Sequence, residues 1–268
     1  MPPNATPSPS SDVEQLHSLT RGLAVVRALA GAAPGLTIAE TAERASITRA
    51  GARRVLHTLA ALGYVRQDGR RFALTPRVLD LGMGLFAARP LWGVADDIVP
   101  DLCRRLGETT SLAVLDGTDV VYVLRENPPQ RLALAVGVGF RLPAHLSSMG
   151  WVLLADRPDW QREAHLRRVA IEPLTPRTIV DPATLLSAIA RAGDDGFAYT
   201  EATVDEGVAG IAVPVRGPDG RAVASLGIGT RVGRYGREGA IAQLLPPLRS
   251  AATEIEGRLA MVPPARPT

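Results

Sequence analysis

Lysine is absent from this chain of 268 residues, so its positive side chains, apart from histidine, are 30 arginines. Its single cysteine, Cys103, excludes a disulfide framework and a zinc site made of thiolates. No segment approaches the roughly 20 consecutive apolar residues of a membrane span. The N-terminus has neither the basic start nor the apolar core of a signal peptide. We therefore expect a cytoplasmic protein with no membrane partner, with a disordered tail at residues 1–17 and a short tail at residues 263–268.

Signatures of catalysis are also missing. The chain has no Gly-x-Ser-x-Gly motif, and its four histidines are scattered without the spacing of metal ligands. The glycine-rich segments "GVGFRL" and "GIGTRVGRYG" do not form the Gly-x-Gly-x-x-Gly pattern of a dinucleotide site. We expect no enzymatic activity, no cofactor and no metal.

The positive charge is unevenly distributed. Residues 1–78 hold ten arginines against five acidic residues, a balance of +5, whereas the whole chain carries +3. The remaining residues therefore sum to −2. A basic first part and a slightly acidic second part indicate two modules, the first of which faces a polyanion.

The first module has the pattern of a winged helix-turn-helix. Residues 18–35 show the helical period and end in a glycine- and proline-rich turn. Thr37 and Glu40 form a capping-box pattern for a second short helix, and Thr48 can cap a third. Two short strands then flank Asp68-Gly69, a strong hairpin signal.

The third helix carries basic side chains without acidic neighbours. On a helical wheel Arg49, Arg53 and His57 share one side, with Arg54 beside them, and the apolar residues lie opposite. Because like charges four residues apart destabilise a helix, this face is expected to meet an external anion; the alternative is an ordinary solvated basic helix. We expect it to enter the DNA major groove, where Arg53 is the best candidate for a base contact. The predicted DNA contacts are Thr48, Arg49, Ala50, Arg53, Arg54 and His57, with Arg70 and Arg71 at the hairpin tip.

The rest of the chain predicts an α+β domain with an antiparallel sheet flanked by helices. A hairpin turns at Asp116-Gly117, and a helix over 181–196 is capped by Asp181. Helices are also expected from Val94, over 147–155 and over 237–260 with a break at Pro246-Pro247, and strands over 132–138, 196–202 and 210–230. The predicted organisation is a DNA-binding domain at 18–78, a linker helix at 79–92 and an effector-binding and oligomerisation domain at 93–262.

Several segments resemble IclR-type bacterial transcriptional regulators. They are "SLTRGLAVVRALA", "TIAETAERASITRAGARRVLHTLAALGYV", "RRFALTPRVLDLG", "RLPAHLSSMGWVLLA", "GVAGIAVPV" and "ASLGIGT", in family order from Ser18 to about Leu259. The resemblance implies a GAF-like second domain that binds a small metabolite. It also implies a homodimer on a palindromic operator of double-stranded DNA, often paired as a dimer of dimers.

Within this family the chain looks most like the protocatechuate and 4-hydroxybenzoate regulators. The segments "RLPAHLSSMG", "LLPPLRSAA" and "DPATLLSAIARA" carry this resemblance, which implies an aromatic or other organic acid as effector. Two departures lie near the expected pocket. Trp151 stands where that branch commonly has arginine, and Ala209-Gly210 stands where it has arginine and serine.

Candidate effector contacts follow from the chemistry of these segments. Ser147 and Ser148 offer hydroxyls at a helix start, a natural place for an anion, although simple capping is the alternative. Asp205 lies in a loop and could accept hydrogen bonds or merely be solvated, and His145 could equally be structural. The predicted effector contacts are Arg141, His145, Ser147, Ser148, Met149, Gly150, Asp205, Gly210, Ser225 and Gly227.

Two functions remain open at this point. In the first, effector binding in the second domain shifts the arrangement of paired DNA-binding domains through the linker helix. In the second, the protein binds DNA without a ligand and its C-terminal domain only oligomerises. The sequence leaves open whether the protein represses or activates, and it names neither the effector nor the operator.

Overall fold

The structure is a computed structural model that describes residues 16–82, 91–129 and 137–262. The chain forms two compact units, residues 1–88 and 89–268, and each unit is described here by itself. In the described ranges, no helix is both long and apolar enough to cross a bilayer. Residues 1–15 and 263–268, which include most of the predicted tails, lie outside these ranges.

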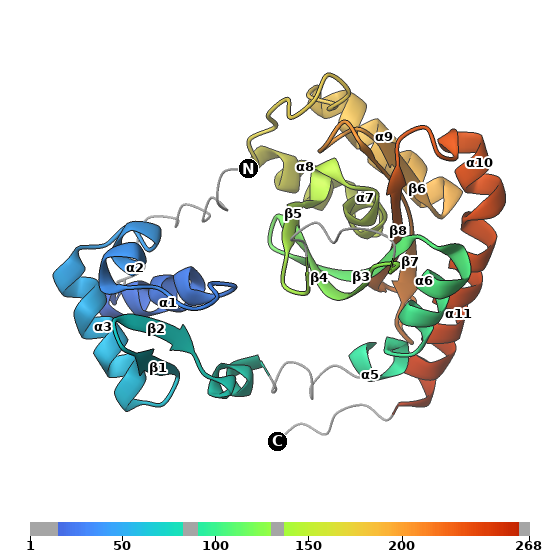
Figure 1. Cartoon of the computed structure of the whole chain (residues 1–268). Helices are drawn as coiled ribbons and strands as arrows, with labels where there is room; N and C mark the ends of the chain where they lie inside the picture. The colour runs from blue at the N-terminus through green and yellow to red at the C-terminus, as the bar shows by residue number, and fades with distance from the viewer. Residues whose placement is uncertain (1–15, 83–90, 130–136, 263–268) are drawn as a thin grey trace. The chain divides into compact units, whose positions relative to one another are not determined.

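The first unit has the predicted order of helices and strands (Figure 1). The predicted caps are confirmed: Thr37 and Glu40 form a capping box, and the Thr48 hydroxyl accepts a hydrogen bond from the Gly51 N–H. The hairpin turns through Gly69, whose φ of +55° favours glycine. The elements are α1 (His17–Leu29), α2 (Ile38–Arg44), α3 (Arg49–Ala61), β1 (Val65–Asp68), β2 (Arg71–Leu74) and a 3-10 turn, η1 (Pro76–Leu79).

A small apolar core holds this unit together. Phe72 of β2 is 1% exposed, and its backbone pairs with Leu36, which ties the hairpin to the segment before α2. Leu19 and Leu23 of α1 lie outside the core and are 60% and 47% exposed. The core residues are Val25, Leu29, Leu36, Leu56, Val65 and Phe72.

The second unit is built on one antiparallel sheet of six strands in the order β5-β4-β3-β8-β7-β6. The strands are β3 (Thr109–Asp116), β4 (Asp119–Glu126), β5 (Arg141–Pro143), β6 (Ala198–Glu201), β7 (Val208–Arg216) and β8 (Ala222–Arg231). The helices are α5 (Leu91–Ala95), α6 (Ile98–Leu106), α7 (Ser148–Ala155), α8 (Asp159–Arg167), α9 (Pro182–Asp195), α10 (Gly236–Gln243) and α11 (Leu245–Met261), with a 3-10 turn η2 (Ala144–Leu146) before α7.

Helices cover both faces of this sheet. One face packs on α5, α6, α10 and α11 around Leu112, Leu226 and Leu248, and Figure 1 shows α11 running along this side. The opposite face packs on α7 and α9 around Ala113 and Ala212. The sheet is therefore buried on both faces, and α7 lies directly over β7 and β8.

Some predicted elements differ in the structure. The helix expected from Val94 is divided into α5 and α6. Pro100 has no N–H to donate to the carbonyl oxygen of residue 96, four positions earlier, so it lies in the first turn of α6 and not inside a longer helix. The predicted break at Pro246-Pro247 is confirmed, since both prolines lie in the first turn of α11. Helix α8 and strand β5 were not predicted. Of the predicted linker helix, residues 80–82 are helical and 83–90 lie outside the described residues, as does most of the strand expected at 132–138.

Candidate nucleic-acid interface and ligand-binding face

The basic side of α3 is exposed, as the helical wheel predicts. Arg49, Arg53, Arg54 and His57 all lie on the surface, whereas Gly51, Ala52 and Leu56 are buried. Within residues 16–82, none of these basic side chains forms an ion pair. The positive charge of this helix is therefore left for a partner outside the unit. Thr48 and Ala50 are exposed at the start of the same helix.

The two wing arginines have different surroundings. Arg70 follows the turn residue Gly69 and is exposed without an ion pair in the described part of the unit. Arg71 donates to the Gly35 carbonyl oxygen at 2.7 Å and lies 3.4 Å from a Glu40 carboxylate oxygen. The hydrogen bond from the Thr37 backbone N–H lowers the pKa of Glu40, so this carboxylate is charged beside Arg71. Arg71 thus fastens the wing to the start of α2, and Arg70 is the freer of the two.

Three of the predicted effector residues share one face of the second unit's sheet. The pairing register aligns Ser225 with Pro214, Gly227 with Ala212, and Gly229 with Gly210 across β8 and β7. Ala212 belongs to the core beneath α7. Because paired residues share a face, Ser225, Gly227 and Gly210 all lie on the side that α7 covers.

The start of α7 supplies the facing wall. A Cβ atom built on Gly210 would lie 2.9 Å from the Ser148 Oγ, and one built on Gly227 would lie 2.8 Å from the Met149 Cγ. The Ser147 hydroxyl accepts the Gly150 N–H at 3.0 Å, so Ser147 caps the helix. Gly150 faces the backbone of Ala144 and lets η2 pass close to α7.

The structure does not bring Arg141, His145 and Asp205 into this group. Arg141 pairs with Val121, which places it on the opposite face of the sheet. Its guanidinium is held by the carboxylates of Asp116 and Asp119, at 2.7 and 3.0 Å, because β5 lies beside the β3–β4 turn. Asp205 is exposed in the loop after β6, where its carboxylate accepts the Gly207 N–H.

His145 is buried against α8. It is 2% exposed, and its ring centre lies 6.4 Å from that of His165. Neither ring nitrogen of His145 has a hydrogen-bond partner among the described residues. Burial lowers the pKa of His145 to about 4, so the folded protein holds this ring neutral.

Trp151 has a structural role at the same place. Its indole N–H donates to the His145 carbonyl oxygen at 2.8 Å, and the side chain is 7% exposed. Trp151 therefore fastens the start of α7 to η2 and supplies no charge there.

A cation on the α7-covered face was not predicted from the sequence. Arg125 pairs with Ser111 in the β3–β4 ladder, and Ser111 pairs with Gly227 in turn, so all three share the face that α7 covers. The Arg125 Nη1 donates to the Ser111 Oγ at 3.3 Å, and its Nε is buried without a hydrogen-bond partner among the described residues. In the described part of the chain no carboxylate pairs with Arg125, and burial lowers the pKa of its guanidinium.

Aromatic rings lie beside this arginine. The Arg125 Cζ lies 5.2 Å from the ring centre of Tyr122, and Tyr122 stacks on Phe140 with the ring centres 5.9 Å apart. A bulge in β4 explains why strand alternation missed this group. Tyr122 and Arg125 are three residues apart, which would place them on opposite faces of a regular strand, but the register shift next to Val123 brings them to the same face.

Free space lies over one part of this face. A Cβ atom built on Gly229 would meet no atom of the described residues within 4 Å, although Gly210, its partner on β7, is crowded by Ser148. The face therefore combines one unneutralised arginine, an aromatic ring, hydroxyl groups and glycines that leave room. This combination suits a small organic anion.

Known families match both units. The family described as "Bacterial transcriptional regulator IclR C-terminal" matches residues 86–257, and the "IclR helix-turn-helix domain" matches residues 18–69. The Pca regulon regulatory protein of Pseudomonas putida is 36% identical over 92% of this chain and 85% of its own length. The p-hydroxybenzoate hydroxylase transcriptional activator of Acinetobacter baylyi is 33% identical over 90% of this chain and 91% of its own.

A solved structure extends the similarity to three dimensions. The crystal structure of an IclR homolog complexed with 4-hydroxybenzoate from Microbacterium hydrocarbonoxydans has a TM-score of 0.80 and 26% identity. It covers 91% of this chain and 100% of that chain. The chain therefore belongs to the IclR family of transcriptional regulators, with a helix-turn-helix domain that binds DNA and a C-terminal domain that binds a small effector.

Proposed function

We propose that the effector of this regulator is an aromatic carboxylic acid whose carboxylate binds Arg125. The observation that carries this proposal is the half-buried Arg125 on the α7-covered face, which has no carboxylate partner in the described part of the chain. An arginine side chain keeps its charge in proteins. Removing that charge from water without a counter-ion is costly, so a ligand carboxylate would relieve the cost.

The neighbours of Arg125 favour an aromatic ligand over an aliphatic one. Tyr122 and Phe140 present stacked rings next to the guanidinium, and offset or edge contacts with a further ring are favourable. Ser225 lies on the α7-covered face of the sheet, and Ser148 faces it from the start of α7. The Ser225 hydroxyl has no hydrogen-bond partner among the described residues. It can therefore bond a ring hydroxyl of the effector.

Relatives support this class of effector. The names of two of them refer to the Pca regulon and to p-hydroxybenzoate hydroxylase, and a similar protein is complexed with 4-hydroxybenzoate. We propose Arg125, Ser148, Met149, Gly210, Ser225 and Gly227 as the effector contacts, with Ser147 and Gly150 shaping the start of α7.

The experiment compares two arginines of one sheet. Purified protein is titrated with 4-hydroxybenzoate and with protocatechuate by calorimetry, for the wild type, Arg125→Gln and Arg141→Gln. Because a charge-assisted hydrogen bond contributes about 1.5–3 kcal/mol, Arg125→Gln should weaken binding by about tenfold or more. Arg141→Gln should leave it unchanged, since Arg141 is held by Asp116 and Asp119 on the opposite face. Loss of binding in Arg141→Gln alone would overturn the assignment.

On DNA, we propose that α3 enters the major groove of each half of a palindromic operator. Its exposed arginines lack ion-pair partners in the described part of the unit. Thr48 caps the start of the helix, which is the end that a recognition helix presents to the bases. Arg53 is the proposed base contact. Arg49, Arg54 and His57 are proposed to bind phosphates or neighbouring bases along with Thr48 and Ala50, and Arg70 of the wing is proposed to bind adjacent phosphates, with Arg71 beside it.

We further propose that α1 forms the contact between two copies. Leu16, Leu19 and Leu23 lie on one side of α1 and are 72%, 60% and 47% exposed. A palindromic operator requires two DNA-binding domains related by a two-fold axis, and a second copy of α1 would cover these leucines. A dimer of dimers is the larger assembly that we propose for the full chain.

A further inference from the structure

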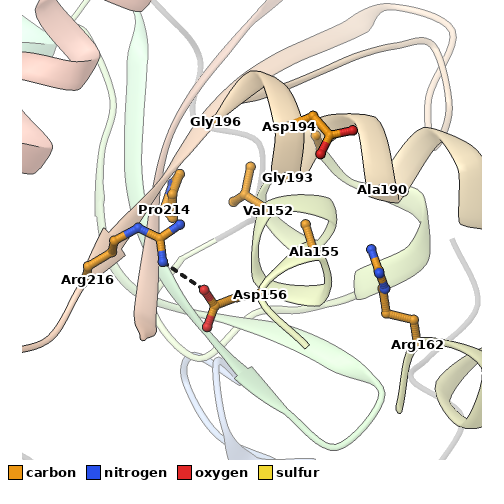
Figure 2. Close-up of a pocket in the computed structure, with 11 residues that line it drawn as sticks. Val152, Ala155, Asp156, Arg162, Ala190, Gly193, Asp194, Gly196, Pro214 and Arg216 are labelled. Atoms are coloured by element: carbon orange, nitrogen blue, oxygen red, sulfur yellow. Dashed lines mark hydrogen bonds and ion pairs between the residues drawn. The ribbon is translucent and has the colours of Figure 1, made fainter. Parts of the chain in front are cut away.

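A second cavity lies at the far end of α7 from the proposed effector face. It has a volume of about 270 Å³ and is bounded by the end of α7, by Arg162 of α8, by the last turns of α9 and by β7 (Figure 2). The effector face lies at the start of the same helix, where Ser147 caps it. One short helix of eight residues therefore reaches from one site to the other.

Small side chains make the floor of this cavity. Ala155 of α7, Ala190 and Gly193 of α9, and Pro214 of β7 all line it. A Cβ atom built on Gly193 would lie 3.3 Å from the Ala155 Cβ, so α7 and α9 are in close contact there. The space exists because these positions carry no long side chains.

One charged pair at the wall is already satisfied. Arg216 donates to the Asp156 carboxylate at 2.7 Å and to the Gly220 carbonyl oxygen at 2.8 Å. The other carboxylate oxygen of Asp156 accepts the Ala222 N–H at 2.9 Å. Asp156 follows α7 directly, so this pair fastens the end of the helix to β7 and β8 and leaves little capacity for a ligand.

Two other charged groups retain that capacity. Arg162 is only 16% exposed, and its one carboxylate partner within the described ranges is Asp159, which is 85% exposed. Figure 2 shows the Arg162 side chain extending from α8 toward α9, and Asp194 on α9 near the end of that helix. In the described part of the chain Asp194 forms no ion pair and no side-chain hydrogen bond. The walls thus present one cation and one anion to the same small space.

We propose that this cavity binds a small zwitterion of the size of a free amino acid, with its carboxylate on Arg162 and its ammonium group on Asp194. A volume of about 270 Å³ equals about nine water molecules at roughly 30 Å³ each, which is room enough for a free amino acid. The charges match, since an anion alone would leave Asp194 unpaired and a cation alone would face Arg162. The floor accommodates an aliphatic side chain.

Binding at this cavity is coupled to the effector through α7. The ligand would contact Val152 and Ala155, and a change in the position of α7 would move Ser148 and Met149 against the sheet. Linkage makes such coupling reciprocal, so each ligand changes the affinity of the other by the same factor. This coupling rests on the proposed effector face, whereas binding at the cavity does not.

The experiment uses the full chain and two matched carboxylates. Glycine, alanine, serine, valine and leucine are each added in millimolar excess, and the melting temperature and calorimetric Kd are measured for the wild type, Asp194→Asn and Asp195→Asn. At least one amino acid should stabilise the wild type. Because Asp194 is exposed, Asp194→Asn should weaken that binding by about twofold to fivefold, within the range expected for an exposed ion pair. Asp195→Asn, a neighbouring carboxylate outside the lining, should bind as the wild type does.

Two further variants separate the outcomes. Ala190→Leu fills the cavity and should abolish binding, while Ala183→Leu at the other end of α9 should not. Arg125→Gln should bind the amino acid normally even where it has lost the aromatic acid. The proposal is overturned if none of the five amino acids binds, if Asp194→Asn binds as tightly as the wild type, or if Arg125→Gln removes binding, since that result would place the amino acid at the effector face.

Discussion

Arg53 and Arg125 share one property at the scale of the residue: each is a guanidinium without a carboxylate partner in the described part of its unit. Arg53 is exposed on α3, and Arg125 is half-buried on the sheet. Arg71 and Arg141 make the contrast, since each is paired with a carboxylate of its own unit. Arg53 and Arg125, which lack such a partner, are therefore assigned to the anions of DNA and of the effector.

Arg53→Ala tests the base contact. We expect operator affinity to fall by about 1–3 kcal/mol, with relaxed preference at one base position, because a bidentate contact to a base is lost. Gel retardation on the protein's own promoter fragment and on unrelated DNA measures both effects. An equal loss on the two DNAs would contradict base reading and make Arg53 a phosphate contact.

His145 predicts a dependence of stability on pH. The unfolded histidine titrates at 6.5, while burial lowers the pKa of the folded residue to about 4, with His165 disfavouring its charged form and Asp119 favouring it. The unfolded chain therefore binds more protons between these values, and stability is lost as pH falls from 6.5 toward 4. We expect His145 to account for about 2–3 kcal/mol of this loss.

Urea unfolding of the DNA-free protein at several pH values measures the effect. In His145→Leu the loss of stability below pH 6.5 should be smaller than in the wild type, although His165, whose pKa burial also lowers, retains part of it. His57→Leu removes an exposed histidine and should keep the wild-type slope. An unchanged slope in His145→Leu would contradict the assignment.

At the scale of the element, α7 is the helix on which the second unit depends. It begins at the Ser147 cap, packs on five strands of the sheet and ends at Asp156, which is fastened to the β7–β8 hairpin. Its close approach to η2 requires glycine at position 150. That requirement is steric rather than conformational, because the φ of Gly150 is not in the left-handed region.

Gly150→Ala tests this approach. The new Cβ would lie 2.0 Å from the Ala144 carbonyl oxygen, so the η2 backbone must move. We expect a loss of about 3 kcal/mol or more, the upper range for overpacking a buried site. Thermal or urea unfolding measures it.

Gly229→Ala is the matched control. Its Cβ meets nothing within 4 Å, so its stability should stay within about 0.5 kcal/mol of the wild type. If Gly150→Ala and Gly229→Ala were equally stable, η2 and α7 would not be packed as closely as the structure shows.

At the scale of the whole molecule, the two units separate two tasks. The first unit offers a basic helix and an uncovered leucine row on α1, and the second encloses the proposed effector face between a sheet and α7. Operator binding by two copies would link DNA binding to effector binding, because a palindromic operator requires the DNA-binding domains to be held in pairs.

A double variant, Leu19→Glu with Leu23→Glu, tests the pairing. Burying a leucine contributes about 1.5–3 kcal/mol, so charging both should weaken association and operator affinity. The unit should still fold normally, because both side chains are exposed in the single chain. Sedimentation measures the mass of the assembly, which should fall below that of the wild-type dimer or dimer of dimers. Leu174→Glu, an equally exposed leucine of the second unit, should sediment as the wild type, and a double variant that does the same would contradict the contact.

Local signals in the sequence determined the winged helix-turn-helix. The capping box at Thr37, the Thr48 cap, the turn at Gly69 and the basic side of α3 all depend on residues within a few positions of one another. Such short-range interactions can be derived from spacing alone. For the same reason the β3–β4 hairpin and the helix capped by Asp181 were predicted correctly.

Only the tertiary structure decided which polar residues meet. A single bulge in β4 brings Arg125 to the α7-covered face, and β5 pairing turns Arg141 away to the opposite one. These positions depend on register and strand order, which join residues far apart in the chain. Periodicity within a strand carries no information about its neighbours, so the arginine proposed to hold the effector could be recognised only once the sheet was assembled.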